Sequence, residues 1–358
     1  MNEPALFSSF EIKSKILRNR VVLSPMCQYK AANGIMSDWH FQHYSRFAFS
    51  GLGAAFIEAT GVSSQGRITH GCTGIWSDHH IQGLSRIVNI FKEYNCISGI
   101  QLAHAGRKAS FLRPWDGASP ITSDAVKETA WETIGPSAIP INNSSPVPKE
   151  MTVEDINNLK DDFKKAAQRA NKSGFDMVEI HGAHGYLLHS FFSPISNKRN
   201  DAYGGNFENR IRLSLEITKE VKSVWPENKP IFFRLSSVDG ADGGATLEEN
   251  VKLAKALKDV GVDVVDCSSG GIGGSPVLTK SKIIPGFQVP YSEKIKNEAN
   301  ISSMAVGAII DANQANEIIL NKRADLVALG RELLADPQWV YKAATYFNLE
   351  NAKSYLPD

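Results

Sequence analysis

Eight short apolar segments alternate with helical segments along the chain, and this alternation limits its possible folds more than any other feature. The predicted strands span residues 20–25, 54–60, 97–102, 175–180, 231–235, 262–267, 301–306 and 324–329. Helical periodicity predicts helices at residues 153–173, 208–225, 247–260 and 312–320. This repeat favours an α/β fold, a closed (β/α)8 or TIM barrel, over an open doubly wound sheet. No GxGxxG motif opens a helix to support the open sheet.

The length of the chain is compatible with one large barrel. Its 358 residues could form two domains, but α/β barrels often run this long as one, so we expect a single domain over residues 1–358. Residues 109–150, after the third strand, form a long insertion that contains Trp115 and Trp131. We expect this insertion to be ordered and to form a lid or rim over the site. Residues 270–276 predict a flexible glycine-rich loop after the sixth strand.

Charge and cysteine usage exclude several classes of function. The formal net charge is +1 without a basic block, so we expect no nucleic-acid partner. We find no apolar signal core near the start and no run long enough to span a membrane. The cysteines are widely spaced and form no CxxC motif: Cys27, Cys72, Cys96 and Cys267. A reduced, cytoplasmic protein fits these features.

Two imidazoles and a phenol follow the fourth predicted strand within six residues. They are His181, His184 and Tyr186, in a turn punctuated by Gly182 and Gly185. Catalytic groups of α/β barrels sit at the carboxyl ends of the strands. Two neutral imidazoles can donate N–H bonds to one oxygen, and a nearby phenol can deliver a proton. This set suits a reaction that builds negative charge on a carbonyl oxygen and protonates the neighbouring carbon.

The same histidines allow two other interpretations. Their spacing of three could place two metal ligands on a helical turn, with Asp239, Asp266 or Cys267 as a third ligand. That arrangement would indicate a metal-dependent barrel hydrolase, although no recognised metal-binding spacing is present. The pair could also be purely structural.

Further polar side chains lie at the ends of other strands. Cys27 and Tyr29 follow the first strand and project to the same side if the chain stays extended there. Cys27 could instead be a small buried hydrophobe. In the third strand, Gln101 offers a donor and an acceptor suited to a heteroaromatic edge.

The last strands predict an anion site. In the fifth strand, Arg234 follows three apolar residues and needs a partner, which could be Glu179, Asp266 or an anionic cofactor. Gly307 and Gly330 follow the seventh and eighth strands, and Arg331 adds a charge. Loops at these two positions form the usual phosphate site of the barrel.

Several motifs together resemble those of a known family. The strongest is residues 179–194, which continues into 196–205. The others are residues 17–20, 24–29, 62–67, 74–78, 101–108, 135–139 and 208–210. From Leu6 to about Asn348 the chain resembles the Old Yellow Enzyme family of FMN-dependent ene-reductases, in its bacterial "thermophilic-like" branch of single-barrel flavoproteins.

This resemblance implies a reaction and a role for each residue of the first cluster. His181 and His184 would bind the carbonyl oxygen of an α,β-unsaturated substrate, an activated alkene, and Tyr186 would protonate its α-carbon. Reduced FMN would give hydride to the β-carbon after taking it from NADPH or NADH. Cys27 would lie beside the flavin and tune its potential, and Tyr29 would line the substrate pocket. A flavin redox sensor with Cys27 as the sensing group is an alternative.

The resemblance also implies how the flavin is held. Residues expected around the isoalloxazine and the ribityl chain are Ser24, Pro25, Met26, Cys27, Gly61, Gln101 and Arg234. Gly307, Gly330 and Arg331 would bind the phosphate, and no metal is expected. Assembly as a homodimer or homotetramer is expected by analogy.

Three positions depart from the pattern of this family. Gly61 stands where relatives often carry Ala, and Met304 ends the seventh predicted strand where they often carry Gly. The chain closes on Leu356, Pro357 and Asp358 without the arginine that often reaches a neighbouring subunit's site, so we expect that feature to be absent or truncated.

Overall fold

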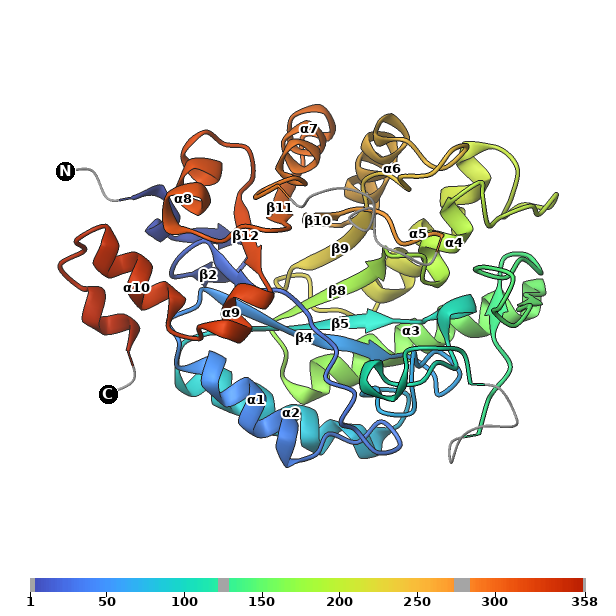
Figure 1. The fold of residues 1–358 in the computed structure, drawn as a ribbon, viewed down its shortest axis with the longest axis horizontal. Helices are drawn as coiled ribbons and strands as arrows, with labels where there is room; N and C mark the ends of the chain where they lie inside the picture. The colour runs from blue at the N-terminus through green and yellow to red at the C-terminus, as the bar shows by residue number, and fades with distance from the viewer. Residues whose placement is uncertain (1–3, 122–128, 274–283, 357–358) are drawn as a thin grey trace.

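The computed structural model describes residues 4–121, 129–273 and 284–356, and its centre is a closed barrel of eight parallel strands (Figure 1). Around the barrel the strands are β3 (Val21–Leu23), β4 (Ala54–Gly61), β5 (Ile97–Ala103), β8 (Met177–Gly182), β9 (Ile231–Ser236), β10 (Val264–Ser268), β11 (Ser302–Val306) and β12 (Leu326–Leu329). β12 pairs with β3 and closes the ring. The predicted TIM barrel is therefore confirmed.

Burial on both faces explains why these strands read as continuous apolar runs. Outward-facing side chains pack against the surrounding helices, and inward-facing ones form a separate apolar cluster inside the barrel. Phe56 and Phe232 meet edge to face there, with ring centroids 5.1 Å apart. Because side chains fill its lower interior, the barrel is a packed core rather than a pore.

A short hairpin closes the amino-terminal end of the barrel. It consists of β1 (Phe10–Ile12) paired antiparallel with β2 (Lys15–Leu17). Ile12 and Leu17 are buried in the same apolar cluster as the inward-facing strand residues. Polar chemistry is therefore left to the opposite end, where the strands finish.

Helices surround the barrel, as Figure 1 shows. They are α1 (Asp38–Ala48), α2 (Ile81–Glu93), α3 (Val153–Ser173), α4 (Leu187–Phe192), α5 (Phe207–Lys222), α6 (Leu247–Val260), α7 (Val289–Ala299), α8 (Ala312–Leu320), α9 (Arg331–Ala335) and α10 (Trp339–Tyr346). The predicted boundaries of α3, α6 and α8 are confirmed. α3 begins with a reciprocal cap, because Thr152 Oγ1 accepts from Asp155 N at 3.1 Å and Asp155 Oδ2 accepts from Thr152 N at 2.9 Å. Within the described ranges, no helix is both long and apolar enough to cross a membrane.

Some boundaries differ from the prediction, and two of them affect the site. β3 ends at Leu23, so residues 24–30 leave the barrel as irregular chain. β8 extends to Gly182, which places His181 inside the strand and only His184 in the turn. Met304 does not end its strand: it lies two residues before Val306 and is buried inside the barrel. The expectation that Met304 ends the strand was therefore wrong.

The insertion after the third barrel strand is partly described. It holds a 3-10 turn at Pro114–Asp116 and two short paired strands, β6 (Ile134–Gly135) and β7 (Lys149–Glu150). Residues 274–276 of the predicted glycine-rich loop lie outside the described residues, as do Pro357 and Asp358.

Candidate active site

The structure brings the two histidines and Tyr186 together at the carboxyl end of β8. The ring centroids of His181 and His184 are 5.3 Å apart, and those of His181 and Tyr186 are 5.0 Å apart. Both pairs meet nearly at right angles, so the edge of one ring is directed at the face of the other. Tyr186 is the residue before α4, so the strand, the turn and the helix start each present one ring.

Hydrogen bonds and burial set the protonation of the histidines. Ala183 N donates to His181 Nδ1 at 3.3 Å, so the neutral ring carries its proton on Nε2. His184 Nε2 lies 2.6 Å from Ser268 Oγ. Burial, followed by the charge of Arg234, holds the pKa of both imidazoles well below the usual range. Both rings are therefore neutral near pH 7 and each keeps one N–H to donate.

Tyr186 keeps its proton. Burial, with added repulsion from Cys27 and Cys72, raises the pKa of its phenol well above the ordinary tyrosine value. The ammonium group of Lys108 lies 5.4 Å from the centroid of the ring. The phenol is thus a neutral donor beside two neutral imidazoles.

Cys27 and Tyr29 lie close to this cluster, although the chain between them is not extended as the prediction assumed. Tyr29 has a φ of +53°, yet its phenol still makes a side-chain hydrogen bond with the Cys27 thiol. Burial raises the pKa of Cys27 well above its usual value, and the neighbouring Cys27 and burial raise the pKa of Tyr29. Tyr186 adds to the shift of Tyr29. A thiol held in its neutral form is poorly suited to react as a redox sensor.

Two buried pairs lie on the barrel strands close to this cluster. Gln101 Nε2 donates to Glu179 Oε1 at 2.7 Å, and Arg234 Nε lies 3.1 Å from Asp266 Oδ2. Register explains this choice of partners, because Gln101 is opposite Glu179 and Arg234 is opposite Asp266 on neighbouring strands. Arg234 therefore pairs with Asp266. Burial, followed by repulsion from the Asp266 carboxylate, raises the pKa of Glu179. Burial also raises the pKa of Asp266.

The Glu179 carboxyl should make stability depend on pH. Its pKa is raised on folding, so its protonation favours the folded state at low pH, and that contribution is lost as the pH rises. In Glu179→Gln the amide can still accept from Gln101 but cannot ionise. We expect the free energy of unfolding of the wild-type apoprotein to fall, relative to Glu179→Gln, as the pH rises above the normal carboxyl range. Urea titrations of both proteins between about pH 5 and 9 test this; parallel stability curves would contradict it.

The predicted phosphate residues share one cavity. A space of about 390 Å³ lies between residues 306–310 and 328–332 and is lined by Gly307, Gly330 and Arg331. Gly307 has a φ of +116°, where a side chain would be strained. Ser24 N donates to Leu329 O at 2.9 Å, which holds the exit of β3 beside this cavity.

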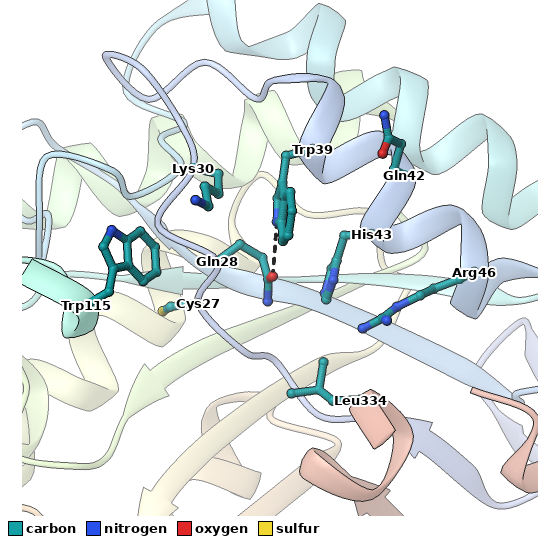
Figure 2. Close-up of a pocket in the computed structure, with 9 residues that line it drawn as sticks. All are labelled: Cys27, Gln28, Lys30, Trp39, Gln42, His43, Arg46, Trp115 and Leu334. Atoms are coloured by element: carbon teal, nitrogen blue, oxygen red, sulfur yellow. Dashed lines mark hydrogen bonds between the residues drawn. The ribbon is translucent and has the colours of Figure 1, made fainter. Parts of the chain in front are cut away.

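A second hollow opens beside Cys27 and is shown in Figure 2. Its volume is about 650 Å³, and α1 supplies one wall with Trp39, His43 and Arg46. Lys30 lies between two indoles, with its ammonium group 4.5 Å from the ring centroid of Trp115 and 5.3 Å from that of Trp39. Of the predicted site residues only Cys27 lines this hollow, so it adjoins the His181–His184–Tyr186 cluster rather than containing it.

Sequence reasoning missed two residues that touch the cluster. Ser268 is the last residue of β10 and contacts His184, so the strand-end rule could have identified it. Lys108 lies within a motif that was noted without a role, and its Nζ donates to His184 O at 2.8 Å and Gly271 O at 3.1 Å. Across the described ranges, no group of three or more His, Cys, Asp or Glu side chains has a geometry that could hold a metal ion.

An α/β barrel with neutral proton donors at its open end, beside a glycine-lined cavity on the last two strands, defines an enzyme that binds a phosphorylated cofactor. Comparison with known proteins names the family. Residues 5–350 match the NADH:flavin oxidoreductase / NADH oxidase family, so the chain belongs to that family, and its resemblance to Old Yellow Enzyme is confirmed. The protein is an oxidoreductase that uses FMN and a nicotinamide nucleotide.

Relatives agree with this assignment, and solved structures share the fold. The chain is 45% identical to an NADPH dehydrogenase of Geobacillus thermodenitrificans over 95% of this chain and 93% of the relative. It is 43% identical to an NADPH dehydrogenase of Bacillus subtilis, over 96% of each chain. Morphinone reductase shares the fold, with a TM-score of 0.79 and 23% identity over the whole of this chain and 94% of that structure. A 2-naphthoyl-CoA reductase superposes with a TM-score of 0.85 and 24% identity, covering 96% of this chain and 52% of that one.

The residues at the barrel mouth fit FMN. A Cβ placed on Gly330 would lie 3.3 Å from Met26 Sδ, so glycine lets the chain after β12 pack closely against Met26 at the edge of this cavity. Deeper in the barrel, Glu179 Oε2 is buried without a hydrogen-bond partner. Polar atoms left without partners in a packed core are typical of a site that is completed by a ligand.

Proposed function

We propose that this oxidoreductase is an ene-reductase that saturates the carbon–carbon double bond of α,β-unsaturated carbonyl compounds. The observation that carries the proposal is the meeting of two neutral imidazoles and one neutral phenol at the open end of the barrel. Bound FMN supplies the hydride chemistry, with NADPH or NADH as the source.

The histidines would bind and polarise the substrate carbonyl. His181 would donate from Nε2, since its Nδ1 already accepts from Ala183. His184 would donate from Nδ1 when the Ser268 hydroxyl donates to its Nε2. Negative charge grows on the carbonyl oxygen as the β-carbon is reduced, and two donors that are already in place stabilise it.

Tyr186 would complete the reaction by protonating the α-carbon. Its phenol is neutral, and its ring centroid is 5.0 Å from that of His181. This placement suits a residue that donates a proton to the substrate that His181 binds. Tyr29 would line the substrate pocket, and Cys27 would lie beside the flavin as a neutral thiol.

Further residues would hold the cofactor in the positions expected from the sequence. Those around the ring system and the ribityl chain are Ser24, Pro25, Met26, Cys27, Gly61, Gln101 and Arg234. Gly307, Gly330 and Arg331 would bind the phosphate, which is supported by the cavity that they share.

The insertion at residues 109–150 would act as a lid over the substrate. Support comes from Trp115, whose ring centroid is 6.4 Å from that of Tyr29, and from Trp131, whose Nε1 donates to Gln65 O at 2.9 Å. We also propose a reducing compartment, the cytoplasm, because all four cysteines are free thiols. Assembly as a homodimer or homotetramer is proposed from family resemblance.

Anaerobic titration of the purified protein tests the proposal. We expect a yellow protein whose flavin absorption is bleached by NADPH and restored by 2-cyclohexenone, with cyclohexanone as the product. Cyclohexanone, a saturated ketone without the double bond, should restore nothing and serves as the matched control. A protein that NADPH bleaches but that no activated alkene reoxidises would refute the ene-reductase assignment.

A further inference from the structure

We propose that His189 and Asp239 form a positioning pair that holds the turn between His184 and Tyr186 in its working geometry. Neither residue has a place in the reaction itself. The pair acts through the backbone of Gly185, and the inference rests on the proposed function for the roles of His184 and Tyr186.

The turn is unusual because two consecutive residues are left-handed. His184 has a φ of +60° and Gly185 a φ of +74°. A Cβ on Gly185 would lie 2.3 Å from Gly271 O, so the backbone is pressed against the neighbouring loop. A non-glycine residue in this conformation costs free energy and persists only where its surroundings hold it.

His189 supplies one of these restraints. Gly185 N donates to His189 Nδ1 at 2.8 Å, so Nδ1 carries the lone pair and the ring proton is on Nε2. That Nε2–H donates to Asp239 Oδ1 at 2.7 Å. The two contacts together require a single neutral tautomer of a histidine that is completely buried.

Asp239 is fixed in turn by a different part of the chain. Its Oδ2 accepts from Ser193 Oγ at 2.6 Å and from Ala245 N at 2.8 Å. Burial would raise the pKa of this carboxyl, but its hydrogen bonds outweigh burial and hold the pKa below the usual value. Asp239 follows β9, whereas His189 and Ser193 follow β8, so the pair ties two neighbouring strand ends together.

Other hydrogen bonds hold the remaining backbone groups of the turn. His184 is held by Ser236 Oγ, which accepts from its N at 2.9 Å, and by Lys108, which donates to its O. Ser190 Oγ donates to Gly185 O at 2.9 Å. The amide of Gly185, directly before Tyr186, is the group that His189 holds. Loss of that bond should therefore displace Tyr186 more than His184, and small misplacements of a reacting group can cost about 10²-fold in rate.

Three substitutions separate the two bonds of His189. In His189→Asn the side-chain oxygen can replace Nδ1 and accept from Gly185, but the amide is too short to reach Asp239. In His189→Gln the amide nitrogen can reach Asp239, but the contact with Gly185 is lost. His189→Phe keeps the ring and loses both bonds. Thr218→Val serves as the control, because Thr218 is fully buried in α5 and, among the described residues, its hydroxyl bonds only to Ser214 O of the same helix.

Two measurements on the apoprotein report on the geometry of the turn at Gly185 and Tyr186 and need no catalytic turnover. We expect amide hydrogen exchange at Gly185 to be faster by about tenfold in His189→Gln and His189→Phe and near wild type in His189→Asn. The ring resonance of Tyr186, assigned by its absence in Tyr186→Phe, should shift in the same two variants. Unchanged exchange and an unchanged resonance in His189→Gln would overturn the proposal.

The functional half of the inference is tested on the flavin-loaded protein. Reoxidation of the reduced flavin by 2-cyclohexenone, per bound flavin, should fall about 10–100-fold in His189→Gln and His189→Phe. Reduction by NADPH, which needs no phenolic proton, should change less than about threefold. Faster exchange with unchanged reoxidation would make the pair merely structural and overturn the positioning role. A wild-type protein that is not reoxidised by enones would refute the proposed function, whereas the apoprotein measurements would still decide the geometry.

Discussion

Replacement of Tyr186 by phenylalanine is expected to slow enone reduction by about 10²–10⁴-fold, the usual contribution of a general acid. The ring and its packing against His181 remain, and only the proton is lost. Reduction of the flavin by NADPH involves no protonation of carbon and should stay near the wild-type rate. Anaerobic stopped-flow measurement of the two half-reactions separates these effects.

A neighbouring phenol provides the matched control for this substitution. Tyr29 shares the barrel mouth and is hydrogen-bonded to Cys27, but it is proposed to line the pocket rather than to transfer a proton. Tyr29→Phe should therefore affect reoxidation far less than Tyr186→Phe. Equal losses in both variants, or no loss in Tyr186→Phe, would remove Tyr186 from the role of proton donor.

Removal of the second imidazole in His184→Ala should lower the rate of reoxidation by an enone about 10²–10³-fold, as for the loss of one oxyanion donor. His184→Asn should recover part of this loss, because its amide can donate a hydrogen bond and asparagine tolerates the left-handed backbone at this position. Stopped-flow reoxidation over a range of 2-cyclohexenone concentrations gives both the limiting rate and the apparent affinity.

Comparison of these variants controls for the contact between His184 and Ser268. Alanine and asparagine both remove the contact between His184 and Ser268, so a loss caused by that contact would be the same in the two. Thermal unfolding of each variant monitors the fold. If His184→Asn is as slow as His184→Ala, donation to the substrate is not what His184 contributes.

Much of the barrel could be predicted because each strand is buried on both faces and so leaves a continuous apolar run. Strand ends were less certain, since apolar composition alone cannot show where pairing stops. The run at 301–306 contains Met304, yet whether Met304 fills the interior or borders a cavity depends on register with β10 and β12. Similarly, residues 24–25 look like strand but leave the sheet after Leu23.

The site could be predicted where its residues are close together in the sequence. It could not be predicted where residues from distant segments contact one another. His181, His184 and Tyr186 are close in sequence, so their grouping could be read directly. Partners of Arg234 could only be narrowed to Glu179, Asp266 or an anionic cofactor, and the alignment of β9 with β10 places Asp266 beside it. Contacts such as that between His189 and Asp239 span 50 residues of chain and leave no local pattern.

The hairpin that plugs the lower end of the barrel has a consequence for the order of events in turnover. Because Ile12 and Leu17 fill that side, ligands can reach the described site from the opposite end of the barrel, where the strands finish. On the proposed function, the oxidised nucleotide must dissociate before the alkene binds. A high concentration of either substrate should therefore inhibit binding of the other. The nicotinamide nucleotide and the alkene then bind strictly in turn during the catalytic cycle.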